Sequence, residues 1–122
     1  MANILIIDDN LSLRTSYSGF LQQLGHQAAA VSSVDEAVAY LATNTPNVIL
    51  LDMLLPRKNG LDFLQQYDIL NAHKDVRVIA FSNLDETRIQ DEAIALGVRL
   101  YLKKSLVTPT ELEAAINEVL AG

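Results

Sequence analysis

Residues 47–52 read NVILLD, an apolar run that ends in the carboxylate of Asp52. A short apolar run of this kind is typical of a strand buried on both faces. A carboxylate in such a run is costly unless it is paired or bound to a metal. Three further runs end in polar residues in the same way: residues 2–7 before Asp8 and Asp9, residues 76–81 before Ser82, and residues 99–102 before Lys103 and Lys104.

The polar residues at these strand ends indicate one shared site. If the strands are parallel neighbours, three carboxylates, a hydroxyl and an ammonium meet at the edge where open α/β sheets bind ligands. Three carboxylates favour a hard divalent cation. The ammonium and the hydroxyl suit an anion such as a phosphoryl group. The set therefore predicts a phosphorylatable aspartate.

Helical segments separate the apolar runs. Gly25 and Gly97 each follow a helical pattern at the position that favours glycine, and Ser33 with Glu36 predicts a capping box. Thr108, followed by proline and by glutamate three residues on, is a further helix start. The expected helices cover residues 11–24, 34–41, 61–70, 85–96 and 109–120, and residues 26–31 supply one more strand, although their three consecutive alanines make it the weakest.

Five alternating strands and helices predict a parallel sheet covered on both faces. Right-handed crossovers leave few topologies. Among them we expect a flavodoxin-like doubly wound α/β fold with strand order 2-1-3-4-5. Its switch point lies between the strands that carry Asp8-Asp9 and Asp52. No linker or repeat is visible, so we expect one domain over residues 1–122.

Composition limits the function classes. The chain has 122 residues, no cysteine and a formal net charge of −6. The absence of cysteine excludes disulfides and thiolate metal sites. The negative charge argues against direct nucleic-acid binding, and no apolar stretch approaches the length of a membrane span. A cytoplasmic protein without membrane contact is expected, since no secretory signal is visible.

The order and spacing of these residues resemble the receiver domain of bacterial two-component response regulators, of the chemotaxis-regulator type. The resemblance covers the whole chain. Its marks are the acidic pair at 8–9, the segment LLDMLLP at 50–56 with Gly60 after it, Ser82, and Gly97 leading to YLKK at 101–104.

The resemblance implies a role for each marked position. Asp52 would accept a phosphoryl group from a sensor histidine kinase or a histidine phosphotransfer protein. Ser82 would bind a phosphoryl oxygen, and Lys104 rather than Lys103 would be the functional lysine. Mg²⁺, or Mn²⁺ in its place, would be held by Asp8, Asp9, Asp52 and the main-chain carbonyl of Leu54.

The resemblance also implies a signalling switch rather than an enzyme with a separate substrate; only its own phosphorylation and dephosphorylation would be self-catalysed. Tyr101 would act as the switch partner of Ser82. The surface formed by residues 85–96, 99–103 and 109–120 would change its packing. That surface would signal to an effector or output domain and is a possible homodimer contact.

Four residues depart from the common family pattern. Ser105 stands where proline with a cis bond is usual, so we expect a trans bond here. Asn83 replaces a small residue after Ser82. Leu54 and Leu84 replace frequently polar residues and offer no hydrogen bond to a hydrolytic water, which predicts slow self-dephosphorylation.

Three other protein classes remain as alternatives. The first is a pseudo-receiver, an interaction module that is not phosphorylated. The second is a flavin- or nucleotide-binding domain, which would need a glycine- or hydroxyl-rich loop after the first strand. The third is a haloacid-dehalogenase-like phosphatase, in which the aspartates of the first strand alternate instead of being adjacent.

Overall fold

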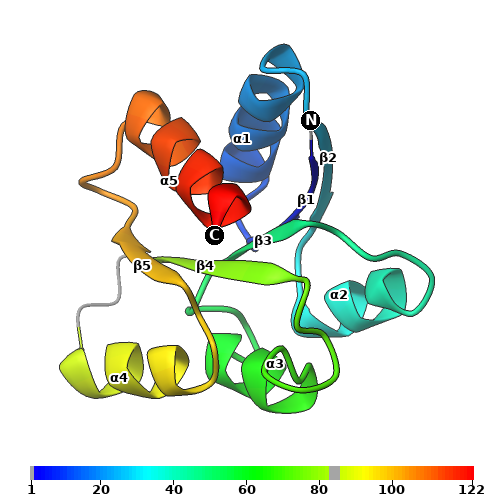
Figure 1. The fold of residues 1–122 in the computed structure, drawn as a ribbon, viewed down its shortest axis with the longest axis vertical. Helices are drawn as coiled ribbons and strands as arrows, with labels where there is room; N and C mark the ends of the chain where they lie inside the picture. Colours follow the sequence, from blue (N-terminus) through cyan, green and yellow to red (C-terminus); the bar gives the residue numbers. More distant parts are fainter. Residues whose placement is uncertain (1, 83–85) are drawn as a thin grey trace.

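The computed structural model describes residues 2–82 and 86–122, in which strands and helices alternate. The strands are β1 (Asn3–Ile7), β2 (Gln27–Val31), β3 (Val48–Leu51), β4 (Arg77–Ser82) and β5 (Leu100–Lys103). The helices are α1 (Leu11–Gln23), α2 (Val34–Leu41), α3 (Gly60–Gln66), α4 (Thr87–Ala95) and α5 (Pro109–Ala121). Figure 1 shows how they are arranged.

All strand pairs in the sheet are parallel, and the strand order is β2-β1-β3-β4-β5, which confirms the predicted topology. The register pairs Ile7 with Leu51 across β1 and β3. The residues that follow these two, Asp8 and Asp52, therefore leave the sheet side by side. The weak β2 segment does form a strand, paired with β1 along its full length.

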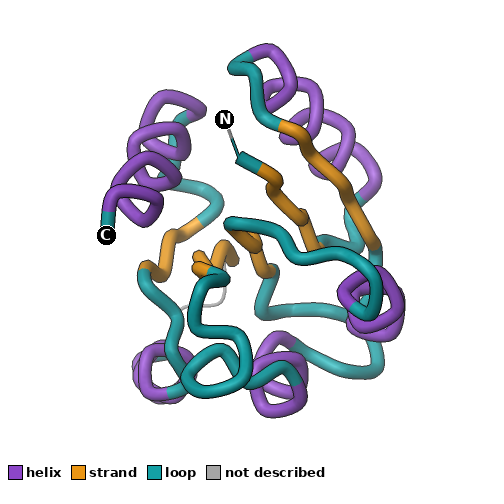
Figure 2. Tube along the Cα trace, turned by 45° about the vertical axis from the view of Figure 1, so that its right-hand side comes forward, coloured by secondary structure: helices purple, strands orange, loops and turns teal. Residues whose placement is uncertain are grey.

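Helices cover both faces of the sheet, as Figures 1 and 2 show. α1 and α5 lie on one face, where Leu21 and Ile116 pack on Ile4 and Ile79. α2, α3 and α4 lie on the other. The central strand β3 is buried along its whole length, which is why its sequence is continuously apolar instead of alternating.

The helix ends follow the sequence signals in most places. Gly25 and Gly97 adopt φ values of 94° and 108°, the left-handed region that glycine enters without strain. The Thr108 hydroxyl accepts from the Glu111 N–H, and the Glu111 carboxylate accepts from the Thr108 N–H. None of the helices in the described part of the chain has both the length and the apolar character of a membrane span.

Two sequence-based expectations about helix ends were wrong in part. The Ser33 hydroxyl caps α2, but the Glu36 carboxylate accepts from the N–H and hydroxyl of Ser32 instead of closing a box with Ser33. The third helix was expected to reach residue 70 but ends at Gln66. There the Asp68 carboxylate accepts from the N–H groups of Leu70 and Asn71, which offers the backbone a turn in place of another helical turn.

Candidate functional site

Asp8 and Asp52 form the centre of the candidate site, at the carboxyl ends of β1 and β3. They are 2% and 5% exposed, so both are almost fully buried. The Asp52 N–H donates to the Ile7 carbonyl at 2.9 Å, which continues the β1–β3 ladder up to the acidic residue. Asp8 Oδ1 accepts from the Asn10 N–H, and Asp52 Oδ1 accepts from the Leu54 N–H, both at 2.9 Å.

Lys104 joins the two carboxylates from the loop after β5. Its Nζ lies 2.5 Å from Asp8 Oδ2 and 3.0 Å from Asp52 Oδ2. The lysine side chain is 11% exposed, so both ion pairs are largely shielded from water. One ammonium thus holds together two strand ends that would otherwise repel each other.

Asp9 completes an acidic cluster with Asp8 and Asp52. One carboxylate oxygen from each of the three lies within 4.8 Å of the others. Asp9 is exposed while the other two are buried, so the cluster opens to solvent on the Asp9 side. Three carboxylates against one lysine leave two uncompensated negative charges. Oxygen ligands with that charge fit a divalent cation such as Mg²⁺.

The pKa values of the two central groups shift for opposite physical reasons. Burial raises the pKa of Asp52 above its ordinary value, and the hydrogen bonds from the Leu54 N–H and Lys104 offset only part of that effect. Burial also disfavours the charged form of Lys104, but the hydrogen bonds to Asp8 and Asp52 outweigh it and raise the pKa of the lysine. The ammonium therefore stays charged at neutral pH.

The remaining predicted residues lie on adjoining elements. Ser82 ends β4 next to β3, is 1% exposed, and its carbonyl accepts from the Lys104 N–H at 3.1 Å. Tyr101 is half-buried in β5 and packs against the core beneath α4. Leu54 is 53% exposed beside Asp52. The bond before Ser105 is trans, as expected. Asn83 and Leu84 lie outside the described residues.

Gly60 fixes the loop that follows Asp52. A Cβ at this position would lie 2.8 Å from the Met53 Cα, and the Gly60 N–H donates to the Met53 carbonyl at 3.1 Å. Only glycine allows α3 to begin this close to the strand end. In the same loop Arg57 adopts φ = 68°, which is strained for a residue with a side chain.

The sequence did not single out Arg14 as a site residue. Its Nη1 donates to the main-chain carbonyl of Asp8 at 2.8 Å. This hydrogen bond stabilises the turn that carries Asp8 and Asp9. The only signal was its place in the helix that starts just after the acidic pair. That position alone does not distinguish it from a solvated arginine.

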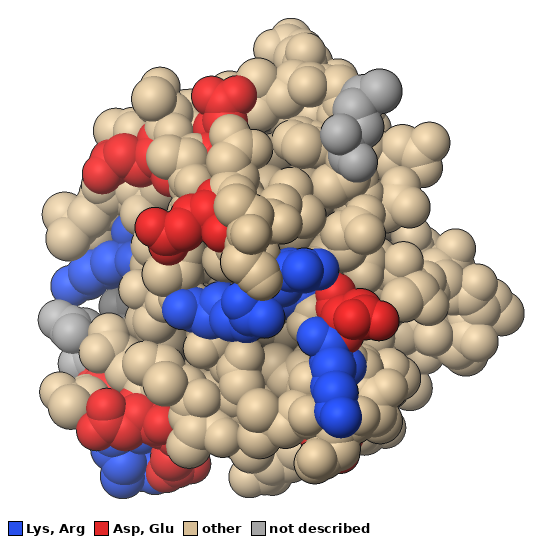
Figure 3. Space-filling model, viewed as in Figure 1, with Lys and Arg blue, Asp and Glu red and all other residues tan. Residues whose placement is uncertain are grey.

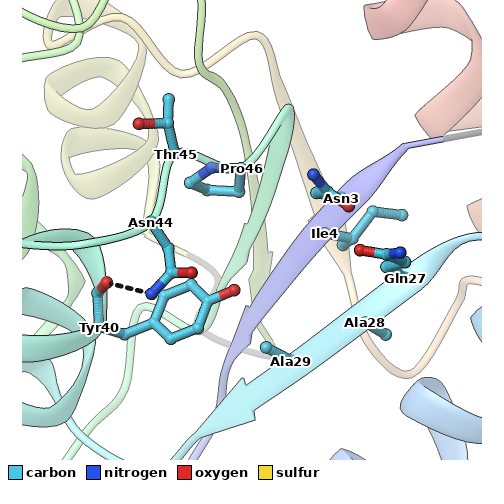
Figure 4. A pocket seen from close by; sticks show the side chains of 9 residues that line it. All are labelled: Asn3, Ile4, Gln27, Ala28, Ala29, Tyr40, Asn44, Thr45 and Pro46. Atoms are coloured by element: carbon cyan, nitrogen blue, oxygen red, sulfur yellow. Dashed lines mark hydrogen bonds between the residues drawn. The ribbon is translucent and has the colours of Figure 1, made fainter.

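Among the described residues, no other surface feature gathers a comparable set of charged groups. A hollow of about 230 Å³ lies at the amino ends of β1 and β2 (Figure 4), where Asn44 Nδ2 donates to the Tyr40 carbonyl. Its lining holds amide and hydroxyl groups but no charged side chain, and we assign it no role. On the face in Figure 3, basic side chains lie in a short band across the middle and also at the left and lower-left edges, with acidic side chains among them, so they form no extended basic surface there.

Comparison with known proteins places this geometry in a family. Residues 4–117 match the family model of the response regulator receiver domain. The chain belongs to this family and is the receiver domain of a two-component response regulator. This membership sets aside the flavin- or nucleotide-binding and phosphatase alternatives.

Individual relatives agree with this assignment. The chain is 30% identical over 117 residues to the probable transcriptional regulator ycf27 of Porphyridium aerugineum, covering 96% of this chain and 47% of that protein. It is 30% identical over 122 residues to protein PilH of Pseudomonas aeruginosa, covering all of both chains. A CheY-like receiver domain protein from Methanospirillum hungatei superimposes with a TM-score of 0.91 at 23% identity, covering 99% of this chain and 94% of that one. The chain spans about half the length of the ycf27 relatives.

Proposed function

We propose that residues 1–122 form one cytoplasmic receiver domain that accepts a phosphoryl group on Asp52 in a Mg²⁺-dependent reaction. The observation that carries the proposal is the convergence of Asp8, Asp9 and Lys104 on the Asp52 carboxylate. The protein is a switch that catalyses its own phosphorylation, not an enzyme with a separate substrate. Its phosphodonor is a sensor histidine kinase or a histidine phosphotransfer protein.

Each residue has a defined task in this proposal. An Asp52 carboxylate oxygen attacks phosphorus and forms an O–P bond while the bond from phosphorus to the donor breaks. Asp8, Asp9, Asp52 and the Leu54 carbonyl would hold the cation, and a bound cation would offset the repulsion between the carboxylate and the incoming anion. Lys104 and the Ser82 hydroxyl neutralise and orient the transferred group.

The signal then leaves through the surface formed by α4, β5 and α5. Phosphorylation adds charge at the carboxyl edge of the sheet, and Ser82 and Lys104 are drawn toward it. The Lys104 N–H donates to the Ser82 carbonyl, so the two residues are linked through their main chains. Tyr101, on the strand next to β4, follows this movement as the switch residue. The partner is an effector or output domain, or a second copy of the chain.

Incubation with acetyl phosphate followed by intact-mass measurement tests the proposal. The wild type should gain one phosphoryl group with Mg²⁺ or Mn²⁺ and none with EDTA. Asp52→Asn should gain none under any condition. Asp91→Asn, which removes an exposed carboxylate from α4, is the matched control and should be labelled like the wild type.

The pseudo-receiver alternative predicts a different result. A wild type that neither gains mass nor binds Mg²⁺ would support an interaction module without phosphorylation. Equal labelling of the wild type and Asp52→Asn would instead move the acceptor to another residue.

A further inference from the structure

Two aromatic side chains stand beside the acidic cluster without a part in the proposed reaction. Phe81 directly precedes Ser82 in β4 and is 3% exposed. Tyr17 projects from α1, and its ring meets the Phe81 ring at a centroid distance of 5.1 Å and an interplanar angle of 69°. This edge-to-face geometry is the favourable one for a pair of aromatic rings. The two rings therefore form an aromatic wall between α1 and β4.

The Phe81 ring of this aromatic wall lies next to Lys104. Lys104 Nζ lies 5.9 Å from the centroid of the Phe81 ring, within the distance of about 6 Å at which a ring attracts a cation. Burial raises the pKa of Tyr17, and Lys104, Asp8 and Asp52 all act on it electrostatically. The geometric link from Tyr17 to Lys104 therefore runs through the Phe81 ring.

We propose that Phe81 and Tyr17 are positioning residues that hold the Lys104 ammonium in line with Asp52, with Phe81 carrying the ammonium and Tyr17 bracing Phe81. The proposal rests on the role of Lys104 in phosphoryl transfer proposed above. In this proposal neither aromatic residue takes part in bond making or bond breaking.

The physical need for such a support follows from the lysine itself. Its charge sits on a flexible four-carbon stem that loses entropy when it is held in one place. In the structure Asp8 and Asp52 hold it, but both are proposed to bind the cation, and Asp52 is proposed to be modified. The Phe81 ring keeps its electron distribution through these changes. It supplies a contact for the ammonium that does not depend on the state of the carboxylates.

A double-mutant cycle in the rate of phosphorylation by acetyl phosphate tests the proposal. Phe81→Leu keeps most of the apolar volume but removes the ring. It should slow phosphorylation roughly three- to tenfold at saturating donor, leaving the half-saturating donor concentration unchanged. In a Lys104→Met background the same change should have no further effect. Equal slowing in both backgrounds would overturn the proposal, because the ring would then act through general packing.

The Tyr17 part has its own pair of variants. Tyr17→Phe keeps the edge-to-face contact and should phosphorylate at the wild-type rate, whereas Tyr17→Leu should be slowed in the same direction as Phe81→Leu. If Tyr17→Phe is slowed as much as Tyr17→Leu, the hydroxyl matters rather than the ring, and the bracing role is wrong. Val78→Ala is the control for a general loss of stability in β4. Val78 packs on the face of this strand opposite to Phe81.

A second measurement tests the contact between Lys104 and Phe81 without the phosphorylation reaction. The Lys104 ε-methylene protons should show a ring-current shift by NMR in the metal-free wild type and in Val78→Ala, and the shift should vanish in Phe81→Leu. Persistence of the shift in Phe81→Leu would contradict the contact. A wild type that takes up no phosphoryl group would refute the proposed function, while this shift would still decide whether the wall positions Lys104.

Discussion

Lys104 Nζ lies 3.0 Å from Asp52 Oδ2, although the two residues are 52 positions apart in the chain. The same nitrogen contacts Asp8 Oδ2. One cation therefore contacts two buried carboxylates, on strands that are adjacent only in the folded sheet. Removing one partner from such an arrangement leaves buried charge without compensation.

Lys104→Met should therefore destabilise the metal-free protein by about 3 kcal/mol, measured by urea unfolding in EDTA. Mg²⁺ should restore more stability to this variant than to the wild type, because the cation then compensates the carboxylates alone. Lys74→Met, which removes an exposed lysine from the loop before β4, should change stability little and is the control. Equal losses in the two variants would show that the ion pairs contribute nothing net.

Mg²⁺ should raise the melting temperature of the wild type. At a free concentration tenfold above Kd the stabilisation is about 1.4 kcal/mol. Asp9→Asn should show a smaller shift at the same concentration, because Asp9 is the exposed member of the cluster and the one not engaged by Lys104. A shift in Asp9→Asn equal to that of the wild type would remove Asp9 from the ligand set.

The phosphorylated protein should lose its phosphoryl group slowly for a receiver domain. Leu54 stands exposed beside Asp52 and offers no hydrogen bond to an approaching water. Leu54→Asn should speed the decay roughly fivefold, the equivalent of about 1 kcal/mol from one hydrogen bond to that water. The measurement is intact mass against time after donor removal. Decay of the wild type within seconds would show that water access is set elsewhere.

The strained backbone at Arg57 offers a test of stability. With φ = 68°, this residue occupies the left-handed region, which asparagine tolerates better than other residues with a side chain. Arg57→Asn should raise the free energy of unfolding by about 0.5 to 1 kcal/mol. Arg57→Ala, which keeps the unfavourable Cβ, should give no such gain. If alanine stabilises as much as asparagine, removal of the arginine charge and not backbone strain is responsible.

Stability should fall in alkaline solution because of the buried tyrosine Tyr67. Burial raises the pKa of Tyr67 above 10.0, the ordinary value for a phenol. The unfolded chain then loses this proton at a lower pH than the folded protein. The stability from Tyr67 is fully present below pH 10 and is lost as the pH rises through the folded-state value. Tyr67→Phe should flatten the decline measured by urea unfolding between pH 9 and 11. An unchanged slope would contradict the shift.

Much of the fold was predictable from the sequence. Four strands end in the polar residues that the sequence singled out, and Asp8, Asp52 and Ser82 lie at these strand ends as strand position alone predicted. The short apolar runs, the two left-handed glycines and the Thr108 cap are local signals, encoded in neighbouring residues. Such signals can be recognised in the sequence without knowledge of tertiary contacts.

The sequence was less informative where local signals compete. The apolar pattern of the third helix continues to residue 70, yet the helix ends at Gln66 because the Asp68 carboxylate captures backbone N–H groups. Ile69 is then buried from a turn instead of from a helix. Both conformations satisfy the pattern, so only the packing of the folded chain decided between them.

The sequence by itself determined the strand order and the set of groups at the carboxyl edge, because parallel crossovers of one hand leave few arrangements. The tertiary structure decided how those groups meet. It placed one ammonium between Asp8 and Asp52, fastened the acidic turn with Arg14, and set the Phe81 ring near Lys104. These contacts join residues far apart in the chain or on different elements. Their distances depend on side-chain packing across the sheet, which no local pattern encodes.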